Sequence, residues 1–465
     1  AFNCYRHSAI LICRKGGVTG ECYTLHSEEG VTQGDPLAMV LYGLALVPLA
    51  QQLRQEFPKV LSPWYADDSA CEAPCSELGG FMERLRELGP SRGYYTNPEK
   101  SLCITRPQDR GAAQEWLKRF NFRYSDGARY LGSFIGQESD KVAWVDGKID
   151  QWIRSVQILG RIAKRFPQTA YAGMCRSLQM EWQYTLRVVP EVASHFERLE
   201  AAISHDFLPF VLQETTAPSE TLRSQLALPV RCSGLGLPDP STISDDCFDT
   251  SKAVTAPLVA SLIQRQPLDA LDYSAQAAET TAIARGTRNA ALDADYQRLV
   301  RESDGVPQRR LQRAPGTGAW LTTYPSFFNG TELSAEEFFD NVRIRYGFEP
   351  RYLQERCDGC QQRFSVGHAL QCKKGGLITV RHDELCYEGS SLMCQAISPS
   401  AVAPEPYIYT GRAQRTALRD ELDDDGTPSE KPDDRGDILC HGFWRRGRTT
   451  IFDVRVTDTD ARSYL

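Results

Sequence analysis

The sequence contains no apolar run long enough to cross a lipid bilayer. The longest such run, residues 37–50, has 14 residues and includes Gly43 and Pro48, whereas a membrane-spanning helix needs about 20. An excess of positive charge is also missing, because 53 Lys and Arg against 60 Asp and Glu give a net charge of −7. The chain therefore lacks the overall positive field typical of nucleic-acid binders, and we expect no membrane partner.

A disulfide framework is a third absence. The 15 cysteines are scattered and odd in number, whereas secreted disulfide scaffolds are shorter and denser in cysteine. Only Cys357, Cys360 and Cys372 lie close together with a histidine nearby. We therefore expect an intracellular, reducing compartment and one metal cluster. The chain opens at Ala1 without an initiator methionine, and we expect it to be a piece of a longer polypeptide.

The pattern of the chain predicts an α+β fold with about three domains' worth of residues. Strand-like and helix-like stretches alternate up to residue 136, and helices dominate from there to about residue 300. Ser334-x-x-Glu337 is a capping box before a helix that runs towards Tyr346. The expected elements are a helix at 35–53, a hairpin at 64–70, a helix at 75–88, strands at 101–105 and 129–136, linkers at 307–318 and 399–406, an acidic loop at 420–434 and a final hairpin at 437–457.

Two adjacent aspartates, Asp67 and Asp68, lie at a predicted tight turn in W-Y-A-D-D-S-A, residues 64–70. Such a pair usually caps a helix or faces water. The alternative is two-metal phosphoryl chemistry, in which two Mg²⁺ ions about 3.5–4 Å apart need carboxylates from neighbouring strands. Other motifs favour this alternative: G-V-T-Q-G-D-P-L-A at 30–38, N-P-E-K-S at 97–101 and R-Y-L-G-S-F-I-G at 129–136.

Taken in this order, the four motifs resemble the palm of reverse transcriptases, especially those of non-LTR retrotransposons. The resemblance implies a nuclear protein whose partners are an RNA template, a DNA primer or target, and dNTPs. It implies Mg²⁺ or Mn²⁺ as a cofactor. It implies that Asp67 and Asp68 bind the metal ions and that Tyr65 and Ala66 form the floor under the primer terminus. Gln33 and Gly34 would contact the template and the incoming nucleotide, and Lys100 would protonate or neutralise the departing pyrophosphate. The strand that grips the primer would begin at Leu131-Gly132.

One feature of that family has no counterpart here. The palm needs a third aspartate on a strand before the Gln-Gly-Asp-Pro segment, yet the first twenty residues contain no Asp or Glu. We therefore expect the fingers and the first palm strand to lie outside this chain. Because one metal anchor is missing, we also expect little polymerisation from this chain alone.

Basic charge is concentrated between Lys148 and Val189, where seven Lys or Arg accompany two acidic residues. Helical spacing places Arg154, Arg161 and Arg165 on one face. Such a face is usually only solvated, but the resemblance makes this region the thumb and these arginines nucleic-acid contacts. The opposite, apolar face comprises Trp152, Val156, Leu159, Ala163 and Phe166.

Cys357-x2-Cys360-x7-His368-x3-Cys372 offers four ligands for Zn²⁺ within a short segment. The Asp358-Gly359 turn would aim the first two thiolates at one ion, as tetrahedral zinc requires. The alternatives are unrelated buried thiols, or His382 as the fourth ligand. Four protein ligands make a closed, structural site, and the flanking Lys373, Lys374 and Arg381 suit a zinc knuckle that faces nucleic acid.

The last predicted hairpin could carry a second metal site. Asp437 begins one strand, while Asp453 and Arg455 share a face of the next. This arrangement resembles the restriction-like endonuclease that follows the zinc knuckle in one class of non-LTR retrotransposons, and Glu384 would be a further acid. Gly436 and Arg455 replace the family's proline and lysine, and arginine cannot serve as a base. An ordinary hairpin with a basic tip is the structural alternative.

The predicted organisation is a partial palm at 1–136, a thumb at 137–240, a helical connection and linker at 241–345, a zinc knuckle at 346–385 and a partial α/β endonuclease at 386–465. The first hypothesis is an RNA-directed DNA polymerase with a target-nicking endonuclease. The second is a degenerate or domesticated zinc protein that binds nucleic acid without catalysis. A group II intron-type maturase is a third, disfavoured because its usual nuclease is of a different kind.

Overall fold

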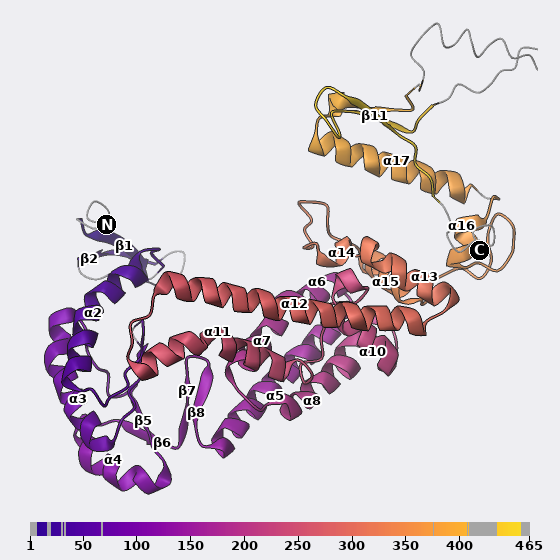
Figure 1. Cartoon of the computed structure of the whole chain (residues 1–465). Helices are drawn as coiled ribbons and strands as arrows, with labels where there is room; N and C mark the ends of the chain where they lie inside the picture. Colours follow the sequence, from indigo (N-terminus) through magenta and orange to yellow (C-terminus); the bar gives the residue numbers. More distant parts are fainter. Residues whose placement is uncertain are drawn as a thin grey trace, which may run out of the picture. The chain divides into compact units, whose positions relative to one another are not determined.

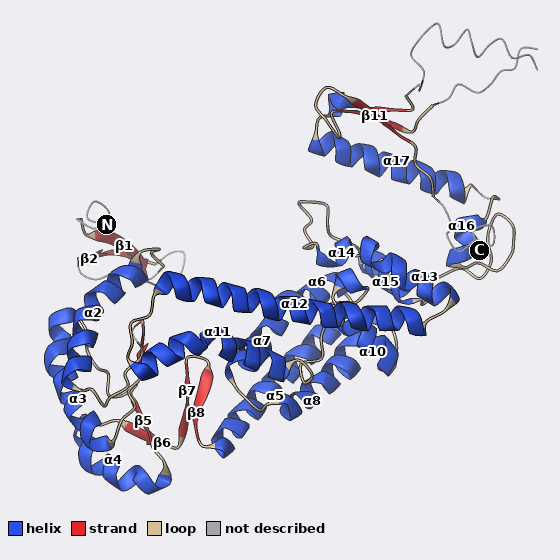
Figure 2. Ribbon diagram, viewed as in Figure 1, coloured by secondary structure: helices blue, strands red, loops and turns tan. Residues whose placement is uncertain are grey.

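The computed structural model describes residues 7–15, 20–28, 34–66, 68–374, 376–406 and 435–456, together with residues 31 and 408. The chain forms two compact units (Figure 1): unit 1 comprises residues 1–303 and 311–335, and unit 2 comprises residues 304–310 and 336–465. Helices dominate and the sheets are small (Figure 2), in agreement with the predicted α+β class. Among the described residues, no helix has both the length and the apolar character needed to span a bilayer. Gln33, Asp67 and the acidic loop at 420–434 lie outside the described residues.

The first part of unit 1 contains small hairpins beside three helices. Its core joins Leu49 and Leu53 of the first helix to Phe81 and Leu85 of the second, all nearly inaccessible to solvent. The i, i+4 spacing of each pair places it on one helix face, which explains why these segments are amphipathic helices. The elements are β1 (Ala9–Arg14), β2 (Cys22–Ser27), α2 (Ala38–Glu56), β3 (Trp64–Tyr65), β4 (Asp68–Ser69), α3 (Cys75–Leu88) and α4 (Arg110–Leu117).

Two further strand pairs follow. β5 (Leu102–Ile104) pairs in parallel with β6 (Arg123–Ser125), which confirms the strand predicted at 101–105. Residues 129–136 do not form the single strand that the sequence predicts. They belong to a hairpin of β7 (Gly127–Tyr130) and β8 (Ser133–Gly136), in which Leu131 and Gly132 form the turn with φ angles of 46° and 82°. A positive φ suits glycine and ends an extended strand, so Leu131-Gly132 is a turn and does not begin a strand.

The helical part of unit 1 is organised around α5 (Glu138–Ala163), which packs beside α8 (Ala193–Ala202) (Figure 1). Trp152 of α5 lies in the core, where its ring is 5.9 Å from that of Phe196 and 6.3 Å from that of Trp182. Phe166 does not continue this apolar face as predicted: α5 ends at Ala163 and the Phe166 side chain is 54% exposed. Pro167 begins the next helix, and the first turn of a helix is a position that suits proline.

A paired arginine and glutamate tie the later helices together. The Arg223 guanidinium makes two hydrogen bonds of 2.6 Å to the Glu200 carboxylate, with side chains only 13% and 17% exposed, and a third of 2.9 Å to the Leu237 carbonyl. The remaining helices of unit 1 are α6 (Pro167–Gly173), α7 (Gln179–Val188), α9 (Leu208–Leu212), α10 (Glu220–Ala227), α11 (Ser244–Gln264), α12 (Ala270–Glu302) and α14 (Ala319–Thr322).

The linker predicted at 307–318 is instead helical. It forms α13 (Gly305–Arg313) and a 3-10 turn at Ala314–Thr317. Leu311 is buried with Leu299 and Leu228, and this packing outweighs the helix-breaking tendency of the Pro and Gly residues. Pro307 itself lies in the first turn, where its missing N–H is not needed.

Unit 2 consists of α15 (Ala335–Tyr346), a compact Cys/His segment with α16 (Val366–Gln371), and the long α17 (Leu377–Ala396) packed on a small sheet. The sheet has the order β11-β10-β9, from Thr449–Phe452, Ile438–His441 and Val402–Pro404. Residues 402–404, predicted as linker, thus form the third strand. The helix towards Tyr346 and the hairpin of β10 and β11 agree with the sequence prediction, and α17 crosses the predicted domain border at 385/386.

Candidate functional site

The Y-A-D-D segment forms a tight β-hairpin. Trp64 pairs with Ser69 and Tyr65 with Asp68, and a second bridge joins Leu61 to Glu72. Ala66 in the turn has a φ of 52°, the left-handed conformation that two-residue hairpin turns require. Asp67 lies outside the described residues. The predicted hairpin at 64–70 is therefore confirmed, with Tyr65 and Asp68 exposed at its end.

Aromatic packing holds the base of this hairpin. The rings of Trp64 and Tyr94 meet edge to face at 5.2 Å, and the Tyr94 hydroxyl lies 2.9 Å from the hydroxyl of Ser69. The edge-to-face arrangement is the one that aromatic pairs prefer. The hairpin is thus anchored on one side, which leaves its turn and the side chains of Tyr65 and Asp68 available to a ligand.

The Leu131-Gly132 turn is fixed by a tyrosine from the helical part. Tyr184 of α7 donates a hydrogen bond of 2.6 Å from its hydroxyl to the Leu131 carbonyl. A Cβ on Gly132 would lie only 2.5 Å from Cε1 of Tyr184, so the close approach of the ring adds to the positive φ in requiring glycine. This contact couples the β7–β8 hairpin to α7.

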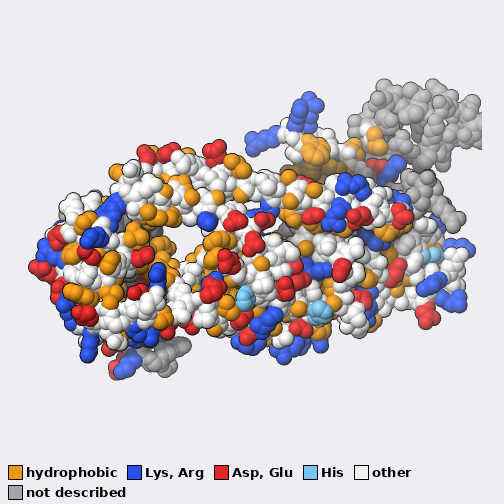
Figure 3. Space-filling view, turned by 60° about the horizontal axis from the view of Figure 1, so that its bottom comes forward, with side chains coloured by type: hydrophobic (Ala, Val, Ile, Leu, Met, Phe, Trp, Pro, Cys, Tyr) orange, Lys and Arg blue, Asp and Glu red, His pale blue; other side chains and the backbone are white. Residues whose placement is uncertain are grey.

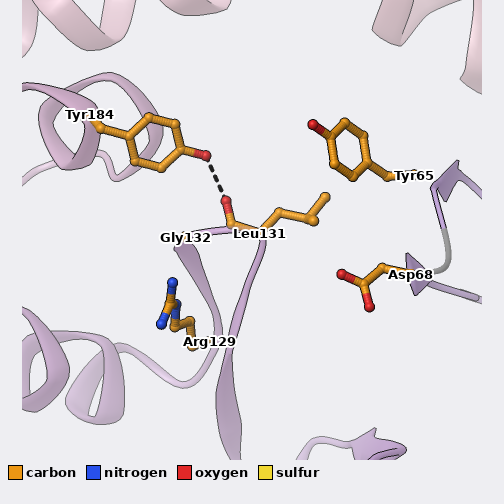
Figure 4. A pocket seen from close by; sticks show the side chains of 6 residues that line it. All are labelled: Tyr65, Asp68, Arg129, Leu131, Gly132 and Tyr184. Atoms are coloured by element: carbon orange, nitrogen blue, oxygen red, sulfur yellow. Dashed lines mark hydrogen bonds between the residues drawn. The ribbon is translucent and has the colours of Figure 1, made fainter. Parts of the chain in front are cut away.

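The two hairpins and α7 line an open cavity of about 600 Å³, shown in Figure 4. Tyr65 and Asp68 project into it from one side, and the Leu131-Gly132 turn faces them with Tyr184 behind it. The structure thus brings two sequence motifs some sixty residues apart to opposite walls of one space. The lining residues are Tyr65, Asp68, Arg129, Leu131, Gly132 and Tyr184.

The charges around this cavity are sparse. Among the described residues that line it, Asp68 supplies the carboxylate and Arg129 the cation. Burial, and then the negative charge of Asp68, raise the pKa of the neighbouring Tyr130 hydroxyl. A two-metal centre needs clustered carboxylates, and one described carboxylate beside an arginine does not provide them. The described residues therefore do not by themselves fit a magnesium site.

The other residues of the predicted palm site lie apart from this cavity or outside the described residues. Gly34 has a φ of 93° just before α2, as expected for a turn glycine. Lys100 is exposed in a turn in which Asn97 accepts backbone hydrogen bonds from residues 99–101, and it is not among the lining residues. The cavity thus combines Tyr65 and Asp68 with the Leu131-Gly132 turn. Gln33 and Asp67 are outside the described residues.

The predicted arginine stripe is present on α5 and just beyond it. Arg154, Arg161 and Arg165 are exposed on the side opposite the buried Trp152. The Arg165 guanidinium lies 5.4 Å from the centre of the Phe166 ring, a distance typical of a cation–π contact. Figure 3 shows basic, acidic and apolar side chains interspersed over the face that it draws, so that face carries no uniform positive field.

The Cys/His segment of unit 2 gathers four metal-ligand atoms. The sulfur of Cys372 lies 3.7 Å from the sulfurs of both Cys357 and Cys360, and the Cys360 sulfur lies 3.2 Å from Nε2 of His368. All four ligand atoms fall within 4.8 Å of one another. His368 is the histidine of this cluster, and the alternative ligand His382 belongs to a different group. These separations are those of the edges of a tetrahedral zinc site.

Local backbone structure explains this convergence. Gln361, with a φ of 64°, reverses the chain after Cys360 and donates its N–H to the Cys357 carbonyl at 2.7 Å. Ser365 caps α16 by accepting the N–H of His368 at 3.0 Å, which fixes the start of the helix that carries the histidine. A backbone N–H from Cys360, aided by a hydrogen bond from His368, lowers the pKa of the Cys357 thiol to about 6. The metal-binding thiolate is therefore favoured near neutral pH.

Of the flanking cations of this cluster, Lys373 and Lys374 are exposed. Arg381 instead donates a hydrogen bond of 3.3 Å to the Ala369 carbonyl and links α17 to α16. The structure therefore gives Arg381 a role in packing, whereas the two lysines are accessible to an anionic partner.

The residues of the predicted nuclease site separate into two groups. Asp437 faces α17, where His382 Nε2 lies 3.1 Å from its Oδ1, while Asp453 is exposed and pairs with Arg455 at 2.8 Å. Glu384 is also exposed. A proline could not replace Gly436, because its N–H donates to the Pro406 carbonyl and a Cβ would lie 2.2 Å from Ile451 Cγ2. The described metal-ligand group at Asp437 comprises His382 and Cys386, not Asp453.

Comparison with models of known protein families finds no match for this chain. No curated protein matches it either. Sequence reasoning had missed Arg129 and Tyr184 as cavity residues, and Cys386 as a neighbour of Asp437. No local pattern marks Tyr184, because its contact with Leu131 joins residues 53 apart in the chain. The i, i+4 spacing of His382 and Cys386 could have signalled their shared helix face.

Proposed function

We propose that the chain is the palm and thumb part of a retrotransposon reverse transcriptase, and that the cavity between the two hairpins receives the 3′ end of a DNA primer on an RNA template. The observation that carries this proposal is the position of Tyr65 and Asp68 opposite the Leu131-Gly132 turn. In the family that the sequence resembles, these motifs meet the primer terminus. Aromatic and glycine surfaces suit this role, since a nucleic-acid base can stack on the first and the backbone can approach closely at the second.

The arginine stripe on α5 supports the same proposal. Arg154, Arg161 and Arg165 would contact successive phosphates of the duplex behind the primer end, because phosphate contacts position a nucleic acid without reading its sequence. Asp68 would lie near the primer terminus, and metal-dependent nucleotidyl transfer would require further carboxylates beside it.

A non-catalytic nucleic-acid-binding zinc protein is the second candidate. The Cys/His cluster with its accessible lysines, Lys373 and Lys374, favours it, since zinc knuckles bind single-stranded segments. Such a protein would bind nucleic acid without placing a primer end in the cavity. Target nicking by Asp437, Asp453 and Arg455 is a prediction from the family resemblance, to which the arrangement of the described side chains adds nothing.

Photocrosslinking of a primer end distinguishes the two candidates. A DNA primer with 5-iododeoxyuridine at its 3′ terminus, annealed to RNA, should crosslink to Tyr65 or Tyr184, because this base reacts with nearby aromatic rings. The same base at the 5′ end should not. Tyr65→Leu should lower the yield, whereas Tyr95→Leu, a change at an exposed tyrosine outside the cavity, should leave it unchanged. Crosslinks that do not depend on which primer end carries the label would contradict the polymerase proposal.

The salt dependence of duplex binding tests the arginine stripe. Replacing Arg154, Arg161 and Arg165 together by Gln should reduce the slope of log affinity against log salt by up to about 2–3, if each contacts one phosphate. The matched control replaces Arg198, Arg231 and Arg298, which are paired with acidic residues, and removes the same charge. Equal loss of slope in both triple variants would show that only net charge matters.

A further inference from the structure

A second group of metal-ligand side chains lies where α17 packs on the small sheet of unit 2. His382 and Cys386 are one helical turn apart on α17, so they share a face, and Asp437 approaches them from the start of β10. His382 Nε2 lies 3.1 Å from Asp437 Oδ1, and the Cys386 Sγ lies 3.7 Å from Nε2 and 3.8 Å from Nδ1 of the same ring. The three ligand atoms fall within 4.8 Å of one another. Separations of this size are those expected around one tetrahedral ion.

Two of the three ligands, His382 and Asp437, are each held by a partner outside the group. His382 Nδ1 lies 3.2 Å from the Asp383 carboxylate, and Oδ2 of Asp437 accepts the backbone N–H of Val454, which leaves Oδ1 directed at the histidine. Ile438 is buried close to Gly389 of α17, so the helix and β10 are in contact at this point. The arrangement matches the outer-shell support of metal-binding histidines, in which a carboxylate holds one ring nitrogen and the other faces the ion.

The three side chains of this group offer an imidazole nitrogen, a sulfur and a carboxylate oxygen. A thiolate, an imidazole and a carboxylate together form a typical Zn²⁺ ligand set and are a poor one for Mg²⁺.

We propose that His382, Cys386 and Asp437 form a second zinc-class metal site, with Nε2, Sγ and Oδ1 as ligands. This site differs from the Cys357–Cys372 cluster because it has three described ligands instead of four. The His382 and Asp437 side chains are 35% and 21% exposed, so water or an anionic ligand can reach the ion. Three protein ligands with an accessible fourth position are the pattern of zinc sites that bind an exchangeable ligand.

Metal stoichiometry tests the site directly. The full chain, stripped by a chelator and titrated with Zn²⁺, should bind two ions per chain by native mass spectrometry. Cys386→Ser and His382→Gln should each bind one, as should Cys357→Ser through loss of the other site. The matched control is Cys394→Ser, a change at a partly buried cysteine on the same helix, which should keep two. A wild-type chain that saturates at one ion would overturn the proposal.

A second measurement avoids variants that fail to fold. In the unaltered chain, the second equivalent of Zn²⁺ should slow alkylation of Cys386 by iodoacetamide by about tenfold or more, because a metal-bound thiolate is a poor nucleophile. Cys394 serves as the internal control and should keep its rate. An unchanged rate at Cys386 would show that the group is only a histidine–aspartate ion pair beside a thiol. Equal protection of Cys394 would indicate general tightening of α17, and would also count against the site.

Discussion

The two candidate sites of this protein are built in opposite ways. The Cys/His cluster of unit 2 draws all its ligands from one short segment, Cys357 to Cys372. The cavity of unit 1 draws its walls from two hairpins and α7, which are distant in sequence. The first can form with little help from the rest of the chain except a metal ion, whereas the second exists only when the helices of unit 1 are packed.

The difference also concerns what stabilises each site. The cluster buries few large apolar side chains, so metal binding must supply much of its folding free energy. The cavity is supported by the core around Trp152, Trp182 and Phe196, and hydrophobic burial fixes its geometry without a metal. Loss of metal should therefore affect one site, and damage to the helical core the other.

The largest expected effect is at the cluster. Cys357→Ser removes one of four ligands, and zinc binding in such modules is worth of the order of 10 kcal/mol at neutral pH. The amides of Cys357 and Cys372, which donate to Gln362 and His368, should then exchange hydrogen as in an unstructured peptide. Amides of α8 in unit 1 should keep their protection. Hydrogen exchange read by mass spectrometry checks both, with Cys247→Ser in α11 as the control.

If the amides around residue 357 stay protected from hydrogen exchange in the Cys357→Ser variant, the cluster does not depend on metal binding and the contrast with the cavity is wrong. This result would mean that the turn at Gln361 and the Ser365 cap hold the segment together without a metal.

The next largest effect is at the helical scaffold. Arg223→Ala leaves the Glu200 carboxylate largely buried without its bidentate partner, at a cost of about 3 kcal/mol. The control is Arg198→Ala, a change in an exposed arginine that pairs with Asp150, which should cost less than about 1 kcal/mol. Urea unfolding of unit 1, followed by tryptophan fluorescence, measures both. Equal midpoints would show that the pair at Arg223 does not secure the helices behind the cavity.

The same contrast explains what the sequence could predict. Each ligand of the Cys/His cluster was predictable, because the spacing of residues within one short segment determines which side chains can meet. The choice left open was whether His368 or His382 is the histidine ligand. The hairpin at 64–70 and the helix at 75–88 were also predictable, since turn residues and apolar periodicity are local signals.

The rest depended on packing between distant segments. The turn at Leu131-Gly132 was predicted as part of a strand. The neighbouring sequence gives no sign of the hydrogen bond from Tyr184 that fixes this turn. Residues 307–318 were predicted as a linker, but packing of the buried Leu311 favours a helix there. Strand alternation predicted that Asp437 and Asp453 share a metal site. In the structure, the residues of α17 that lie beside Asp437 are His382 and Cys386. In each case a tertiary contact outweighs the local pattern.

A smaller effect is expected at the cavity wall. Gly132→Ala forces a Cβ into a backbone with a φ of 82° and to within 2.5 Å of the Tyr184 ring. The left-handed conformation costs about 1 kcal/mol, and displacement of the ring should add about 1–3 kcal/mol. Gly93→Ala is the matched control, because Gly93 has a φ of 72° with open space around it. If both variants lose the same stability and the same yield of primer-end crosslink, the Tyr184 contact does not shape the cavity.

The smallest effect concerns the charge inside the cavity. Burial and then the Asp68 carboxylate raise the pKa of Tyr130, so Asp68→Asn should lower that pKa towards its ordinary value. A raised pKa in the folded state means that folding favours the protonated phenol. The corresponding stability is therefore complete below the ordinary tyrosine pKa of about 10 and is lost as pH rises through the folded value. The Asn variant should lose less stability in this alkaline range.

Spectrophotometric titration of tyrosine ionisation measures the shift in the pKa of Tyr130, and Tyr130→Phe identifies the group. Asp140→Asn, on α5 outside the cavity lining, is the charge control. If Asp68→Asn produces the same difference titration in the Tyr130→Phe background, then Asp68 acts on another tyrosine and its carboxylate does not face Tyr130.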